Sequence, residues 1–83
     1  MSAKEMFEEL GYKETENDIY FLKYYKKCKL HHDKEIKFYK LDKTLCVKDD
    51  NGTFYRWIDI EELQAINKQV EELGWSNNVN ITN

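Results

Sequence analysis

The sequence predicts an α+β fold in which a four-stranded antiparallel meander lies between a short N-terminal helix and a longer C-terminal helix. The same helix ending, Glu-Glu-Leu-Gly followed by an aromatic residue, occurs at residues 8–12 and again at 71–75. The segment between these endings is rich in aromatic and β-branched residues that alternate with polar ones. An Asp-Asn-Gly tripeptide at 50–52 is typical of a tight turn between paired strands.

The first helix is expected over residues 3–10. Ser2 precedes Glu5 by three residues, which is the spacing of a capping box. Gly11 can adopt the left-handed conformation that often follows the last helical turn. The apolar side chains of this segment share one helical face, and they are Ala3, Met6, Phe7 and Leu10.

The second helix is expected over residues 60–73, because Asp59 and Glu62 repeat the capping-box spacing and Gly74 repeats the glycine ending. Its apolar stripe comprises Ile60, Leu63, Ile66, Val70 and Leu73. Its expected solvated side chains are Glu61, Gln64, Lys68, Glu71 and Glu72. Both helices should cover the same face of the sheet, since their apolar stripes need a common surface to bury.

Strands are expected over residues 19–27, 35–41, 44–48 and 53–58, after a polar turn at 13–18. Alternation assigns seven side chains to the face beneath the helices: Tyr20, Leu22, Tyr24, Ile36, Phe38, Leu45 and Val47. For the last strand two assignments stay open, with either Phe54 and Ile58 or Tyr55 and Trp57 facing inward.

The chain has 83 residues, and we expect a single domain over 1–75 followed by a flexible tail at 76–83. An aromatic content of 14% is too high for a disordered chain. No apolar run approaches the roughly 18 residues of a membrane span, and the N-terminus lacks an apolar leader segment. We therefore expect a cytoplasmic protein without membrane contact, in which Cys28 and Cys46 are thiols.

The net charge of −3 conceals an uneven distribution along the chain. Residues 1–18 carry −4, residues 19–48 carry +6 and residues 49–83 carry −5. The expected sheet is therefore basic and the expected helices are acidic. Four of the acids fall near helix C-termini, where the helix dipole makes negative charge unfavourable, and these are Glu8, Glu9, Glu71 and Glu72.

The sheet face turned away from the helices is the candidate binding site. Lysines and tyrosines would alternate there, and the candidate residues are Lys23, Tyr25, Lys27, Lys37, Tyr39 and Lys48. Further basic residues would lie at its edge: Lys26, Lys29, His31 and His32. Three interpretations apply to this pattern: an ordinary solvated face, a protein-binding surface, or a surface for single-stranded nucleic acid, where cations follow phosphates and rings stack on bases.

The residues do not combine into a catalytic or metal-binding set. Cys28 and His31 have the spacing of half a zinc site, but Cys46 lacks a companion ligand for the other half. Two of the three glycines end helices and the third occupies a turn, which leaves none for a phosphate-binding loop. We therefore expect no enzyme activity, no metal and no cofactor.

Residues 3–12 and 65–75 resemble the two ends of a group of short proteins encoded by phages and prophages of low-GC Gram-positive bacteria. The resemblance covers the first and last thirds of the chain, and it supplies no catalytic residues. It implies a small intracellular accessory protein that binds a host or phage protein. We expect a monomer or homodimer. Single-stranded nucleic acid is the alternative partner.

Overall fold

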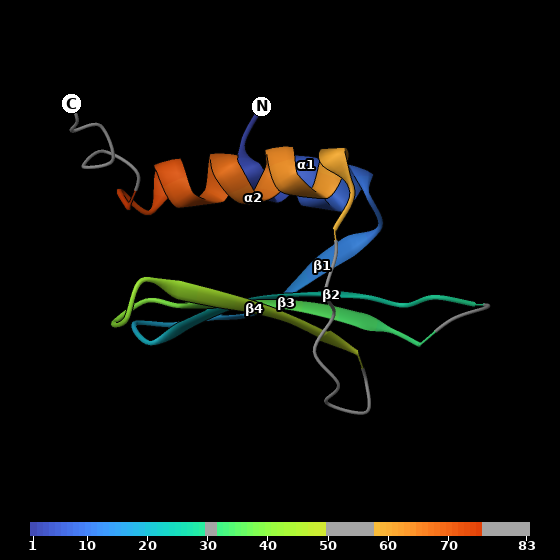
Figure 1. The fold of residues 1–83 in the computed structure, drawn as a ribbon, viewed down its shortest axis with the longest axis horizontal. Helices are drawn as coiled ribbons and strands as arrows, with labels where there is room; N and C mark the ends of the chain where they lie inside the picture. Colours follow the sequence, from blue (N-terminus) through green and yellow to red (C-terminus); the bar gives the residue numbers. More distant parts are fainter. Residues whose placement is uncertain (30–31, 50–57, 76–83) are drawn as a thin grey trace.

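The computed structural model describes residues 1–29, 32–49 and 58–75, and it has the predicted α+β architecture (Figure 1). Its elements in chain order are α1 (Ala3–Glu9), β1 (Tyr12–Asn17), β2 (Phe21–Lys26), β3 (Lys34–Tyr39), β4 (Thr44–Asp49) and α2 (Ile60–Glu72). The strands form one antiparallel meander in the order β1-β2-β3-β4. Both helices lie on the same face of this sheet, as predicted (Figure 1).

The first strand differs from the prediction. Residues 13–18 were expected to form a polar turn, but most of this segment belongs to β1, the strand at one edge of the sheet. The strand expected over 19–27 is correspondingly shorter, and Tyr20, expected to face inward, lies in a turn with half of its surface exposed. The predicted turn at 50–52, most of the strand predicted at 53–58 and the tail at 76–83 lie outside the described residues.

The helix ends agree with the prediction at both helices. Ser2 and Glu5 form a reciprocal capping box at α1, and Asp59 and Glu62 form one at α2. Gly11 follows α1 with a φ of 96° and Gly74 follows α2 with a φ of 79°. These left-handed conformations are readily available only to glycine, which explains its recurrence after both helices.

The core between helices and sheet is aromatic. Phe7 of α1 stacks on Tyr24 with ring centroids 4.1 Å apart, and it meets the edges of Tyr12 and Phe38 at 5.6 and 6.4 Å. Ile36 lies beside them and is fully buried. The inward positions predicted for β2, β3 and β4 are thus confirmed at Leu22, Tyr24, Ile36 and Phe38 and, with partial burial, at Leu45 and Val47.

Helix α2 turns a more polar face to the sheet than its apolar stripe predicted. Ile66 is buried, but Ile60 is 66% exposed and Leu63 is 39% exposed. The buried positions include Glu62 and Gln69, which accept hydrogen bonds of 2.6 Å from the hydroxyls of Tyr12 and Tyr24. The sheet therefore presents tyrosine hydroxyls to the helix, and a purely apolar stripe would leave these buried donors without acceptors.

The structure gives two of the four acids near helix C-termini a partner, one on the other helix and one within α2. The helices run in opposite directions, so the end of α2 lies beside the start of α1 (Figure 1). Glu72 of α2 accepts a 2.9 Å hydrogen bond from the backbone N–H of Ala3. Its carboxylate therefore lies at the positive end of the neighbouring helix dipole. Glu71 forms a 3.2 Å ion pair with Lys68 one turn earlier.

Candidate functional site

The antiparallel register gives the sheet a face that points away from both helices, which we call the outer face. Tyr25, Glu35 and Lys48 lie side by side in one row across β2, β3 and β4, and Lys23, Lys37 and Cys46 form the next row. The outer face comprises Lys13, Glu16, Phe21, Lys23, Tyr25, Glu35, Lys37, Tyr39, Thr44, Cys46 and Lys48.

Five of the six candidate residues lie together on the outer face. They are Lys23, Tyr25, Lys37, Tyr39 and Lys48. Lys27 lies just beyond the end of β2 and is exposed. Lys26 was expected at the edge of this surface, but it points to the inner side, where its ammonium lies 5.5 Å from the centroid of the Tyr12 ring. The positions agree with the prediction for most of the set, and the binding role stays a prediction.

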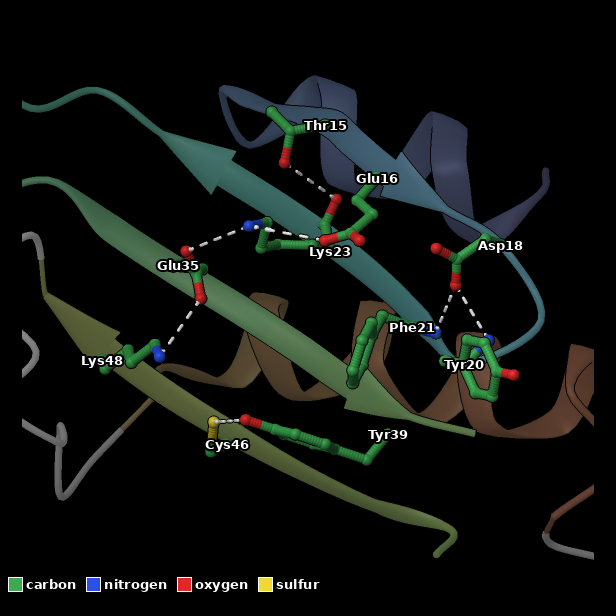
Figure 2. A network of polar contacts seen from close by, with 10 residues as sticks. All are labelled: Thr15, Glu16, Asp18, Tyr20, Phe21, Lys23, Glu35, Tyr39, Cys46 and Lys48. Atoms are coloured by element: carbon green, nitrogen blue, oxygen red, sulfur yellow. Dashed lines mark hydrogen bonds and ion pairs between the residues drawn. The ribbon is translucent and has the colours of Figure 1, made fainter. Parts of the chain in front are cut away.

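The outer face is not uniformly basic, because two glutamates lie between the lysines. Lys23 forms ion pairs of 3.5 Å with Glu16 and 3.9 Å with Glu35, and Glu35 also pairs with Lys48 at 3.7 Å (Figure 2). Like charges on directly opposed residues repel, and Lys23 lies opposite Lys37. The two carboxylates reduce this repulsion, so the face presents alternating charges.

An aromatic pair, Phe21 and Tyr39, lies at one end of the outer face. The ring centroids are 5.6 Å apart in an edge-to-face arrangement. The ammonium of Lys37 lies 4.1 Å from the Phe21 centroid and 5.3 Å from that of Tyr39, within the range of cation–π attraction. The Cys46 thiol donates a weak 3.7 Å hydrogen bond to the Tyr39 hydroxyl (Figure 2).

Beyond the aromatic pair, two turns end the sheet, and they carry apolar residues that sequence reasoning did not include in the site. Ile19 and Tyr20 lie in the β1–β2 turn, and Leu41 lies in the β3–β4 turn; they are 73%, 50% and 75% exposed. Asp18 could have indicated the first of these turns, because an aspartate side chain often accepts hydrogen bonds from backbone N–H groups one or two residues further along a turn. The turn was missed because residues 19–27 were assigned to a strand.

On the inner side of the sheet, Glu62 is the centre of a buried polar cluster. Its carboxylate accepts a hydrogen bond from the Tyr12 hydroxyl and two from the ammonium of Lys34, at 2.8 and 2.9 Å. Burial raises the pKa of Glu62, but hydrogen bonds from Lys34, Tyr12 and the backbone of Asp59 outweigh it and hold the pKa below its usual value. Burial and the Glu62 carboxylate raise the pKa of Tyr12. The cluster fastens α2 to the sheet.

The residues considered for metal binding do not form a site in the part of the chain that the structure describes. Within residues 1–29, 32–49 and 58–75, no three histidine, cysteine, aspartate or glutamate side chains are placed to hold a metal ion. The backbone N–H of Cys28 instead donates to Asp33, which also accepts the Tyr25 hydroxyl. These two hydrogen bonds lower the pKa of Asp33. His31 lies outside the described residues.

Neither of the two described helices is long and apolar enough to cross a membrane. No family model, no curated protein and no solved structure matches the chain.

Proposed function

We propose that this chain is a small, non-enzymatic module that binds a protein partner through the outer face of its sheet. The observation that carries the proposal is the aromatic pair beside alternating charges on the side opposite both helices. Aromatic residues at the centre of a contact supply large buried area, and surrounding charges set the orientation of the partner. The resemblance to phage and prophage proteins makes a host or phage protein the expected partner.

The alternating charges favour a protein over nucleic acid. Glu16 and Glu35 lie among the lysines that would contact phosphates, and their carboxylates would repel a phosphate backbone. The ammonium of Lys37 lies close to the Phe21 ring, on which a base would have to stack. A protein surface can instead provide both signs of charge and meet each side chain with its complement.

Affinity capture from a lysate of a low-GC Gram-positive bacterium tests the proposal. Lys37→Glu reverses one charge on the outer face, and Lys4→Glu makes the same change at an exposed position of α1. We expect a protein that wild type and Lys4→Glu retain and that Lys37→Glu loses. Circular dichroism checks that all three chains are folded. Capture that does not differ between the two variants, or no captured protein at all, contradicts the proposal.

Single-stranded nucleic acid is the second candidate, and the grouping of Lys23, Lys37 and Lys48 near two aromatic rings favours it. Titration of a labelled oligonucleotide at low and moderate salt tests this candidate. Binding should weaken steeply with salt and be lost in Lys37→Glu but not in Lys4→Glu, because phosphate contacts release counterions. Absence of binding at low salt, where the electrostatic attraction is strongest, eliminates it.

A further inference from the structure

The two turns at one end of the sheet carry three exposed apolar residues, Ile19, Tyr20 and Leu41, which we call the apolar tip. Figure 1 shows the β1–β2 and β3–β4 turns at the same end of the sheet. Two of the three side chains expose more than seven tenths of their surface, so they contribute little to the core. Single exposed apolar residues are common, but a group of them on adjoining turns indicates an interaction surface.

The first turn is held rigidly by Asp18. One oxygen of its carboxylate accepts the backbone N–H of Tyr20 at 2.8 Å and that of Phe21 at 2.9 Å (Figure 2). The same hydrogen bonds lower the pKa of Asp18, so the carboxylate is charged at neutral pH. The backbone that carries Ile19 and Tyr20 is therefore ordered before any partner binds.

Lys40 fastens the second turn to the first. Its backbone N–H donates to the carbonyl of Tyr20 at 2.8 Å. Its ammonium donates to the side-chain oxygen of Asn17 at 2.8 Å and to the carbonyl of Asp18 at 2.6 Å. Leu41 is thereby held beside the β1–β2 turn. A preordered apolar group loses less conformational entropy on binding than a mobile one, which favours its use as an anchor.

The apolar tip is continuous with the outer face. The Tyr20 ring lies 6.2 Å from that of Phe21, which in turn contacts Tyr39. In the two turns of the tip, Asp18 and Asp42 balance Lys40 and Lys43, so the excess charge comes from the outer face. There four lysines (Lys13, Lys23, Lys37 and Lys48) stand against two glutamates (Glu16 and Glu35).

We propose that the apolar tip anchors the partner, and that this partner is a protein with an apolar pocket bordered by carboxylates. This inference rests on the proposed function and names the chemistry of its partner. The apolar side chains would fill the pocket, and the excess lysines of the outer face would meet its acidic border. A lipid surface fits less well, because the tip carries no excess of lysine to attract anionic headgroups.

Selection from a displayed library of random peptides tests this inference with a defined probe. Wild type should enrich peptides that combine aromatic or aliphatic residues with aspartate or glutamate. A synthetic peptide of the enriched sequence should bind Leu41→Ser at least about tenfold more weakly than wild type. Ile60→Ser is the matched control, since Ile60 is similarly exposed but lies on α2, away from the tip. The affinity of this variant for the peptide should equal that of wild type.

Several outcomes overturn the inference. One is an enriched peptide that binds Leu41→Ser as tightly as wild type, and another is enrichment of basic peptides or of none. Tip-dependent sedimentation with phosphatidylserine vesicles would assign the tip to lipid, and a tip-dependent dimer in light scattering would assign it to a second copy. The two proposals can be told apart: lysate capture that depends on Lys37 but not on Leu41 retains the proposed function and rejects only the anchor.

Discussion

Lysine–glutamate contacts lie on both sides of the sheet, and those on the inner side differ from those on the outer side in their access to water. On the inner side, Lys34 and Glu62 are 2.8 Å apart, and only 6% of the Glu62 side chain is exposed. On the outer side, Glu35 lies 3.9 Å from Lys23 and 3.7 Å from Lys48, with three times that exposure. Solvent screening makes the outer contacts weak, whereas the inner pair is shielded from water, so its loss removes buried hydrogen bonds between charged groups.

The comparison assigns different roles to similar residues. Tyrosine, lysine and glutamate on the inner side satisfy one another, and every buried side-chain nitrogen or oxygen in the described residues has a hydrogen-bond partner. Tyrosine, lysine and glutamate on the outer side remain accessible to a partner. Stability should therefore depend on the inner set and binding on the outer set.

The largest expected difference is between two phenylalanines on adjacent strands. Phe38→Ala on the fully buried inner side should lower the free energy of unfolding by about 4 kcal/mol, because it leaves a cavity in the aromatic core. Phe21→Ala on the outer face should cost less than about 1 kcal/mol. Urea unfolding followed by circular dichroism measures both. If Phe38→Ala is unfolded outright, the smaller change Phe38→Leu keeps the comparison measurable.

The second difference concerns the two glutamates. Glu62→Ala should destabilise the protein by about 3 kcal/mol, since it removes a buried carboxylate that accepts hydrogen bonds from both Tyr12 and Lys34. Glu35→Ala should cost less than about 1 kcal/mol, and this cost should diminish in high salt. Equal losses for Glu62→Ala and Glu35→Ala would refute the distinction between the two faces.

A finer difference separates two consecutive tyrosines. Tyr24→Phe removes the donor to the buried Gln69 oxygen and should cost about 1.5 kcal/mol, because an acceptor is left unsatisfied. Tyr25→Phe removes a hydroxyl bonded to the more accessible Asp33 and should cost less. Thermal unfolding of the two variants gives the order directly. A reversed order would mean that the loop around Asp33 is more important for stability than the helix–sheet contact.

The smallest expected effect is a decrease in the free energy of unfolding at acidic pH. The pKa of Glu62 is held below its ordinary value of 4.5 in the folded state, so its contribution is complete above that value. The contribution is lost as the pH falls through the lower, folded pKa. In Glu62→Gln this part of the acid dependence should be absent. Urea unfolding of both chains from neutral to acidic pH measures it, and identical pH profiles would contradict the prediction.

Local sequence signals predicted the helices, their caps and the alternation of β2, β3 and β4. These features depend on residues within a few positions of one another, such as Ser2 with Glu5 or Asp59 with Glu62. The edge strand β1 was missed because its burial is confined mostly to Tyr12 at its start, and its remaining residues are polar. Such a strand has no apolar alternation to reveal it, and it forms because β2 offers free backbone hydrogen-bonding groups.

In the candidate site, too, some features could be predicted from local sequence and others depend on tertiary contacts. Alternation placed Lys23, Tyr25, Lys37 and Tyr39 on one face, and the register confirms that they lie together. The apolar tip could not be predicted, since Ile19 and Leu41 are far apart in sequence. Tertiary contacts from Lys40 to Asn17 and Asp18 bring their turns together.

By itself, the sequence determined where the helices begin and end, the alternation of β2, β3 and β4 and the basic character of the middle segment. These properties follow from short-range hydrogen bonding and from the twofold period of an extended chain. Only the tertiary structure decided that Glu62 is a buried anchor, that Glu72 caps the other helix and that two distant turns form one apolar tip. Each of these depends on contacts between residues far apart in sequence, where a side chain's environment is set by its partner.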